Sequence, residues 1–396
     1  MANSVRALIN PELLKWARES AAITVSLAAE KIKTKPDVLE DWENGKAQPT
    51  FKQLLTISHV YKRPLSLFYL SRIPNDFMPL RDYRRLPEVP SPFNESPQLN
   101  LEIRKAYYRR QIAIELMTML EESFPNLQYR IDINKSPEIL GEKLRQLLDI
   151  SIEEQISWKT DYEALNEWRK KLENLGVLVF QSEKIEVTEM RGFTIADRPL
   201  PVIVVNKKDT PRGRIFSMLH ELVHVLLGES SISGSDQVGY HLTSKEQEVE
   251  VFCNFVAATT LLPQSAFQTD EMLASYENRN EWNDDMVMEV AKRFNVSREC
   301  IWRRLLTRKK ITIDAYQQKR NELLKDFFAH REKQKQAEGG PQYHVKVLSS
   351  IGTFYTELVL NSYYREKITS NTLSEYLGVK LKHISTIENA LFGAAR

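Results

Sequence analysis

Hydrophobic positions recur every three to four residues through most of the chain, which is the spacing of one face of an α-helix. In the first 70 residues this pattern predicts four short helices, which begin near Pro11, Thr24, Pro36 and Thr50. A tight turn separates the second helix from the third, and the third ends at Gly45, a residue suited to close a helix. The segment therefore has the layout of a compact helix-turn-helix module.

The pattern changes twice in the next part of the chain. Phe77–Gln98 contains five prolines and little periodicity, so we interpret it as an extended linker. Helical periodicity then returns in three segments: Leu99–Ser123, Pro137–Leu148 and Asp161–Asn174. Short β-branched or aromatic runs follow and predict the strands of one small sheet: Val177–Phe180, Gly192–Ile195 and Pro201–Val205.

The remainder is predicted to be helical. We expect helices at Thr210–Gly228, Ser244–Leu262, Met286–Phe294 and Ser297–Leu306, the last two forming a second helix-turn-helix-like pair. After a charged break at Lys333–Gly340 comes a last helical unit, Lys346–Asn389, in which a Gly-Val turn again separates two apolar segments. Its role stays unassigned at this level.

The predicted fold class is α+β and mainly helical. We expect an N-terminal helix-turn-helix bundle at 1–75, a Pro-rich linker at 76–98, a domain with a small β-sheet at 99–310 and a C-terminal helical subdomain at 311–396. A length of 396 residues is enough for two or three hydrophobic cores.

Composition narrows the class of protein. With 42% hydrophobic and 27% charged residues the chain is globular, and a formal charge of +2 gives no global attraction to nucleic acid. We expect both cysteines, Cys253 and Cys300, to be buried and reduced. No apolar run approaches the length of a membrane span, so a soluble cytoplasmic protein is expected. We interpret the local basic run around Arg303, Arg304 and Arg308 as a solvated helix face rather than a nucleic-acid site.

The strongest chemical signal lies on the helix predicted between Thr210 and Gly228. His220 and His224 are four residues apart, so their rings project from one face and can bind a single metal ion. Glu221 follows the first histidine and is placed to act as a general base. This HExxH pattern is typical of zinc peptidases, in which the metal activates a water molecule and the carboxylate takes its proton.

A third ligand is expected on the helix that begins at Ser244. Glu250 is favoured and Glu246, one turn earlier, is the alternative; an ordinary solvated acidic helix start is the third interpretation. Asn254 shares the face of Glu250 and is expected to support a ligand histidine through its free N–H. Zn²⁺ is the predicted cofactor, with manganese or iron left open. No oxyanion-stabilising group is assigned, because Tyr240 and His241 are more typical of surface packing.

The N-terminal segment resembles repressor-type (XRE) helix-turn-helix domains. Trp42, Glu43, Gly45, Pro49 and Leu54 occupy the positions that this pattern requires. The resemblance weakens on the expected reading helix, where acidic side chains would repel phosphates. DNA binding and protein packing both stay open for this module, and no DNA-binding residue is assigned.

The central part of the chain, from Trp168 to Arg308, resembles the ImmA/IrrE metallopeptidase family. The resemblance rests on Gly192-Phe193, on Pro201–Asn206, on the HExxH helix and on Glu250–Pro263, where Cys253 and Val256 replace the usual residues. It implies a gluzincin-like site with His220, His224 and Glu250 on zinc and Glu221 as general base. It also implies proteolysis of a regulatory protein, often a repressor, and a helix-turn-helix domain as a common companion.

Two functions compete at this stage. The first is a zinc-dependent endopeptidase that cleaves a regulatory protein such as a transcriptional repressor. The second is a non-catalytic transcriptional regulator, or a toxin–antitoxin or immunity component, with a structural or sensing metal site. Glu221 favours the first, because a structural zinc needs no general base.

Overall fold

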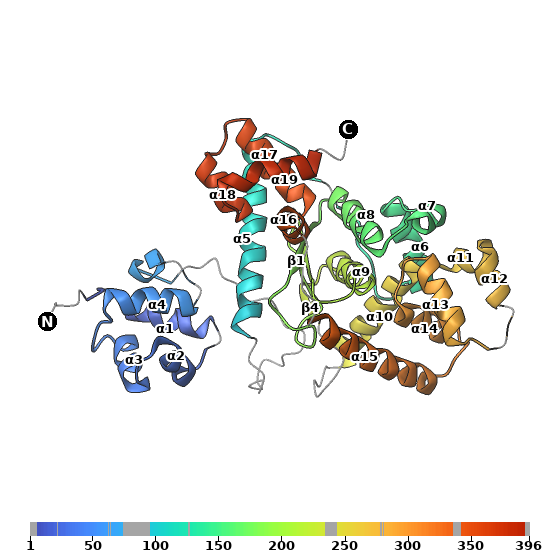
Figure 1. Cartoon of the computed structure of the whole chain (residues 1–396), viewed down its shortest axis with the longest axis horizontal. Coiled ribbons are helices and arrows are strands. Elements are labelled where there is room, and N and C mark those ends of the chain that lie inside the picture. The colour runs from blue at the N-terminus through green and yellow to red at the C-terminus, as the bar shows by residue number, and fades with distance from the viewer. Residues whose placement is uncertain are drawn as a thin grey trace. The chain divides into compact units, whose positions relative to one another are not determined.

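The computed structural model describes most of the chain, and helices dominate it (Figure 1). The described residues are 6–21, 23–61, 63, 65–73, 96–125, 127–233, 244–277, 279, 281–335 and 342–392. They fall into two compact units, with the division inside one long helix between Tyr107 and Tyr108. The mainly helical fold class with one small sheet is confirmed, whereas the domain boundaries expected at 75, 98 and 310 stay predictions.

The N-terminal unit is the predicted helix-turn-helix bundle. Its helices are α1 (Pro11–Glu19), α2 (Val25–Ile32), α3 (Pro36–Glu43), α4 (Phe51–Tyr61) and the 3-10 helix η1 (Leu65–Tyr69). The turn between α2 and α3 lacks the usual glycine, and Lys33 adopts the left-handed conformation there with φ 61°. Apolar faces of all four α-helices meet in one core around Leu39, Trp42 and Leu54.

A buried ion pair ties this bundle together. Arg18 of α1 donates to both carboxylate oxygens of Glu43 on α3, at 2.7 and 2.9 Å. Both side chains are almost completely shielded from water, at 10% and 5% exposure. Either charge without the other would therefore be costly to bury.

The larger unit contains the predicted sheet and most of the helices. The helices up to the sheet are α5 (Pro97–Met119), whose first half belongs to the N-terminal unit, α6 (Pro137–Leu147), α7 (Ile152–Ser157) and α8 (Asp161–Asn174). The strands are β1 (Leu178–Ser182), β2 (Gly192–Ile195), β3 (Val202–Asn206) and β4 (Ser231–Ser233). The helices after β3 are α9 (Pro211–Leu227), α10 (Ser244–Leu261), α11 (Gln264–Thr269), α12 (Glu271–Glu277), α13 (Asp284–Arg293), α14 (Arg298–Thr307), α15 (Ile313–Lys335), α16 (Tyr343–Ile351), α17 (Thr353–Tyr364), α18 (Ser370–Leu377), the 3-10 helix η2 (Leu381–His383) and α19 (Ile384–Phe392).

The sheet has the order β1-β3-β2-β4. β1 is parallel to β3, and β2 is antiparallel to both β3 and β4. The three predicted strands are confirmed within one or two residues, and β4 is an addition that the sequence pattern did not predict. α9 packs against β2, β3 and β4, which places the helix with the two histidines against one face of the sheet (Figure 1).

Caps fix the bounds of α9 as expected. Thr210 accepts the backbone N–H of Gly213 at 3.0 Å, Pro211 occupies the first turn, and Gly228 closes the helix with φ 80°. Every residue from Ser217 to Val225 is buried. The helix that carries the motif is therefore a central element of the core.

The C-terminal helices pack onto the same unit. α16 lies beside β1 (Figure 1). Arg169 of α8 donates to the carbonyl oxygens of Leu348 and Ser349, and Glu173 accepts from Thr353 at 2.6 Å. These buried contacts connect the C-terminal helices to the sheet that supports the motif.

Two predictions about side chains have different outcomes. Cys253 and Cys300 are free and buried, as expected. The interpretation of the basic run as a solvated face is wrong for Arg304, which is completely buried and donates to Glu138 and to the Leu262 carbonyl oxygen. The reason is that neither the packing of α14 against α10 nor the pairing of Arg304 with Glu138 on α6 is visible in a charge pattern. Within the described residues, no helix is both long and apolar enough to cross a membrane.

Candidate metal centre and active site

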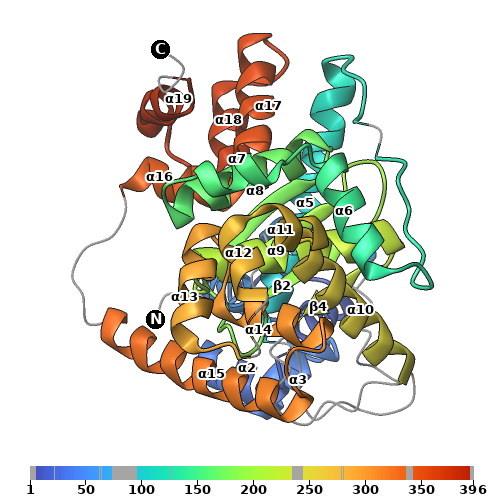
Figure 2. The ribbon, with the colours of Figure 1, turned by 90° about the vertical axis from the view of Figure 1, so that its right-hand side faces the viewer.

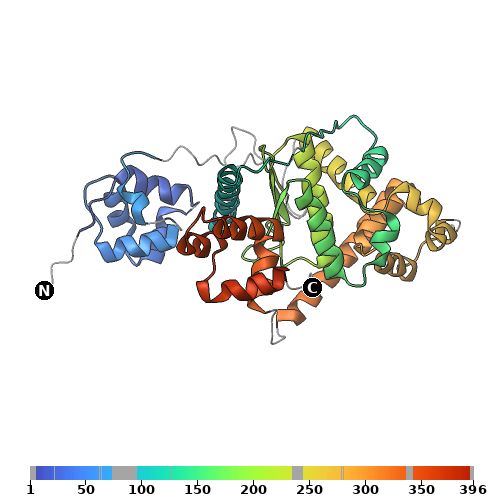
Figure 3. The same cartoon turned by 90° about the horizontal axis from the view of Figure 1, so that it is seen from above.

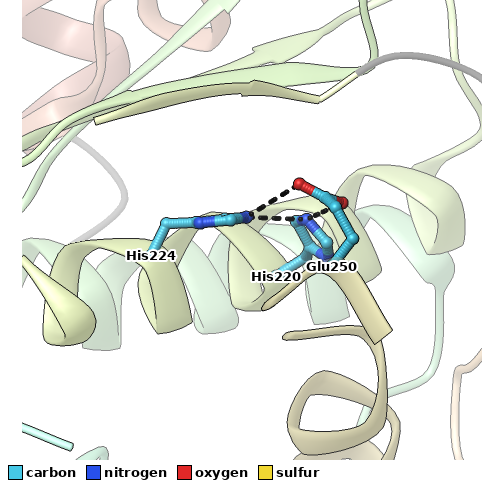
Figure 4. A group of neighbouring side chains, drawn as sticks. All are labelled: His220, His224 and Glu250. Carbon is cyan, nitrogen blue, oxygen red and sulfur yellow. Dashed lines mark hydrogen bonds and ion pairs between the residues drawn. The ribbon is translucent and has the colours of Figure 1, made fainter. Parts of the chain in front are cut away.

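The two motif histidines converge as their spacing predicts. One helical turn apart on α9, they bring their Nε2 atoms to within 3.2 Å of each other (Figure 4). Both side chains are nearly buried, with 6% exposure for His220 and 1% for His224. Two imidazole nitrogens this close are suited to a shared metal ion.

Glu250 of α10 completes a three-residue cluster. Its carboxylate oxygens lie 3.3 Å from Nε2 of His220 and 3.4 Å from Nε2 of His224. The ligand atoms of these three residues all lie within 4.8 Å of one another, and in the described part of the chain no other His, Cys, Asp or Glu joins them. The geometry thus favours Glu250 over Glu246 as the third ligand.

The charge state of Glu250 fits this arrangement. Burial alone would raise the pKa of its carboxyl group, but the adjacent imidazoles of His220 and His224 hold that pKa well below its ordinary range. Two imidazoles and an ionised carboxylate form a donor set that suits zinc.

Two hydroxyl groups on the sheet hold one carboxylate oxygen of Glu221. Thr194 of β2 donates to Oε2 at 2.8 Å and Ser231 of β4 donates to it at 3.2 Å. The other oxygen, Oε1, is buried and has no hydrogen-bond partner among the described residues. Glu221 is therefore fixed in position with one oxygen left to accept a proton.

Gly192 of β2 makes this position of Glu221 possible. A Cβ atom at residue 192 would lie 2.9 Å from Oε1 and 3.1 Å from Cγ of Glu221, closer than carbon atoms normally approach. The strand and the motif helix can thus approach closely because residue 192 has no side chain.

A small pocket of about 60 Å³ is lined by most of the expected site residues. His220, Glu221, Glu250 and Asn254 all line it. Asn254 thus lies where the sequence predicted, although its role beside a ligand histidine stays a prediction. Tyr240 and His241 lie outside the described residues.

The opposite wall of this pocket is charged and was not predicted. Glu299 of α14 accepts from Arg303 at 3.2 Å, lies 3.4 Å from Nε of Arg320 on α15, and accepts from the Tyr316 hydroxyl. Burial raises the pKa of Glu299, but the charges of Arg303, Arg191 and Arg320 outweigh it and lower the pKa. Figure 2 shows the long α15 running beside the shorter α14.

A larger cavity of about 870 Å³ adjoins the small pocket. It extends toward the N-terminal end of α9 and past α14. Four residues line both spaces: Arg191, Phe216, Glu299 and Arg303. The small pocket at the candidate metal centre and the much larger cavity therefore lie side by side, with these four residues between them.

Comparison with protein families agrees with this site. Residues 172–306 match the family model described as the IrrE N-terminal-like domain, which is a peptidase model. This segment is therefore similar to that family. Residues 14–68 match a helix-turn-helix model, so both predicted resemblances are confirmed. His220, Glu221, His224 and Glu250 all lie inside the IrrE-like segment, whereas Arg320 lies beyond it. A search of curated proteins found no match.

Sequence reasoning missed the residues that position Glu221. Thr194 and Ser231 contact it from two strands, and β4 has only three residues, too few for a periodic signal. The alternation of β2 offered one clue, because Gly192 and Thr194 lie on the same face of that strand.

Proposed function

We propose that the IrrE-like domain is a zinc-dependent endopeptidase and that its substrate is a regulatory protein, such as a transcriptional repressor. The observation that carries this proposal is the cluster of His220, His224 and Glu250, together with the buried carboxylate of Glu221, which lines the same small pocket as His220 and Glu250. The peptidase family match supports the reaction class.

Each of the four residues has a distinct role in this proposal. His220, His224 and Glu250 would hold zinc, which acts when bound as a Lewis acid toward water and the scissile carbonyl group. Glu221 receives a proton from the attacking water at Oε1 and delivers it to the leaving amine. Thr194 and Ser231 hold Oε2, so the carboxylate keeps one orientation throughout.

The adjoining cavity supports a protein substrate. A volume of about 870 Å³ accommodates several residues of an extended peptide, whereas the pocket at the metal centre is too small for more than the reacting groups. A regulatory substrate is supported by the helix-turn-helix domain in the same chain and by the resemblance to ImmA/IrrE peptidases.

Comparison of protein N-termini in cells tests the proposal and does not require the substrate to be identified first. Cells that produce the unaltered chain should contain new N-termini that are missing from cells with His220→Ala. The matched control is His59→Ala, because His59 is an exposed histidine of α4 outside the metal cluster and its loss should leave every product in place. Products that persist in His220→Ala cells, or none in any cell, would contradict a metal-dependent peptidase.

A further inference from the structure

The C-terminal helices repeat the N-terminal helix-turn-helix domain. Residues 356–389 align with residues 11–44 without a gap, at a constant separation of 345 positions. The alignment places α17 and α18 opposite α1 and α2, and η2 with the first part of α19 opposite α3. Identical residues are few and include the pairs Ile23 and Ile368, Thr24 and Thr369, Lys35 and Lys380, Glu43 and Glu388, and Asn44 and Asn389.

The helix caps and turn conformations of the two segments agree position by position. Thr24 caps α2 by accepting the N–H three residues later, and Thr369 caps α18 in the same way. The residue after each helix is left-handed, Lys33 with φ 61° and Gly378 with φ 66°. Lys35 and Lys380 are then both extended before the next helix begins. Such a sequence of cap, left-handed turn and second helix defines a helix-turn-helix.

The buried positions agree as well. Buried residues of the N-terminal unit correspond to buried residues at the C-terminus: Leu13 and Leu358, Leu14 and Val359, Ala28 and Leu373, Ile32 and Leu377, Leu39 and Ile384, Trp42 and Ile387. A contact joins the first and third helices in each segment, through aligned glutamates but through partners at positions that do not align. Glu43 accepts from Arg18 of α1, and Glu388 accepts from Tyr364 of α17.

The exposed faces of the two third helices differ in charge. Asp37, Glu40 and Asp41 on α3 correspond to Lys382, Ser385 and Thr386 at the C-terminus. A carboxylate on this face opposes a phosphate backbone, whereas lysine and hydroxyl side chains are groups that contact phosphates and base edges. The C-terminal copy thus has no carboxylate at these three positions of the exposed face.

This C-terminal face is accessible in the larger unit. Lys380, Lys382, Ser385, Thr386 and Asn389 are all exposed. Neither lysine forms an ion pair with any carboxylate in the described part of the chain, so both charges face solvent. α16 packs against the other side of α19, with Tyr343 beside His383 at 4.5 Å between ring centroids. Figure 3 shows α17, α18 and α19 as the red helices at the C-terminal end of the chain.

We infer that residues 356–392 form a second helix-turn-helix and bind duplex DNA. The segment from Lys380 through α19 enters the major groove, with Lys380 and Lys382 on phosphates and Ser385, Thr386 and Asn389 toward base edges. This assigns DNA contact to a part of the chain outside both family matches.

Binding of the full chain to DNA tests the inference. A library of random-sequence duplexes is selected at low salt, and binding of the enriched duplex is then followed by fluorescence anisotropy at several salt concentrations. Lys380→Ala/Lys382→Ala should weaken binding about tenfold or more and lower the slope of log K against log salt by about 2, roughly one unit per phosphate contact. Asn389→Ala should relax the sequence preference of the enriched duplex at a single position.

The matched control removes the same charge from the N-terminal copy. Lys35→Ala/Lys46→Ala should leave affinity nearly unchanged, since both lysines are exposed and Lys35 is the counterpart of Lys380. Circular dichroism is measured for both double variants and should show that both are folded. Enrichment of no duplex, an unchanged salt slope in Lys380→Ala/Lys382→Ala, or an equal loss in both double variants would overturn the inference. The inference would also be overturned if Lys380→Ala/Lys382→Ala left DNA binding unaffected but abolished binding of a protein partner. The face would then be a protein-docking surface.

Discussion

Glu250 and Glu246 lie one turn apart on α10, and the structure separates them as candidate ligands. Because Glu250 contacts both histidines, Glu250→Ala should lose most of the zinc, about one ion per chain, while Glu246→Ala keeps it. Elemental analysis after dialysis against a chelator measures the difference. Full zinc in Glu250→Ala together with loss in Glu246→Ala would move the third ligand one turn back along α10.

Gly192 offers a test of the Glu221 position that leaves every proposed ligand intact. Gly192→Ala forces the carboxylate away, because its Cβ would lie 2.9 Å from Oε1. Zinc content should stay at the unaltered level, and cleavage should fall toward the loss of about 10²–10⁴-fold expected for a missing general base. Undiminished cleavage of a product defined with the unaltered chain would show that Glu221 does not need this close approach.

At the residue scale, the sequence predicted what depends on spacing along one helix. His220 and His224 share a face because they are four positions apart. Glu250 could be predicted as a ligand because the start of the helix that carries it is recognisable in the sequence. The hydroxyl contacts of Thr194 and Ser231 depend on how strands pack over α9, which no local pattern specifies.

At the element scale, the bounds of α8 and α9 followed from caps and periodicity, and the structure matches them closely. The six-residue α7 and the three-residue β4 were missed, because a helix or strand this short is too short for a periodic pattern to be recognised. Arg304 shows a further limit of prediction from the sequence. It lies in a basic run, yet it is buried and pairs with a glutamate on a helix that is distant in the sequence.

One pair of residues on α8 controls how the C-terminal helices attach. Arg169 and Glu173 form a buried ion pair at 3.1 Å, and Glu173 also holds Thr353. Burial lowers the pKa of Arg169, yet Glu173 offsets part of that shift. Glu173→Gln should therefore destabilise the larger unit by about 3–5 kcal/mol, measured by denaturant unfolding.

Two further variants sharpen this measurement. Glu167→Gln on the same helix should cost almost nothing, because within the described residues Glu167 makes no hydrogen bond or ion pair. Arg169→Met/Glu173→Leu should be less destabilising than Glu173→Gln alone, since it leaves no unpaired buried charge. Equal stability of Glu173→Gln and Glu167→Gln would mean that the pair does not hold the C-terminal helices.

At the scale of the whole molecule, two compact units with separate cores predict two unfolding transitions. Glu43→Gln leaves Arg18 buried and unpaired, so it should lower the transition of the N-terminal unit by about 10 °C or more. A chelator should lower the other transition alone. Calorimetry measures both transitions, with Glu19→Gln as the control. Glu19 also contacts Arg18, but from an exposed position, so this variant removes a charge beside Arg18 without removing its buried partner. A single transition shifted by both treatments would contradict independent units.

The repeat between the two ends of the chain was the largest feature that the sequence analysis did not predict. The Gly-Val turn between two apolar segments is visible in the sequence, but few residues are identical between the copies, and no role was assigned to this unit from the sequence. The relation becomes clear from burial and backbone conformation, because a helix-turn-helix core accepts different apolar side chains at each position.

Glu221→Gln tests the central claim most directly, because it preserves the size of the side chain and removes the base. The account predicts that the variant retains as much zinc as the unaltered chain while the new protein N-termini seen in cells disappear, with cleavage reduced by about 10²–10⁴-fold or more. Zinc content and cleavage measured side by side in Glu221→Gln, His220→Ala and unaltered chains give the answer. Unchanged zinc, unchanged N-termini and an unchanged cellular phenotype in Glu221→Gln would contradict a hydrolytic site and favour a regulator with a structural or sensing metal.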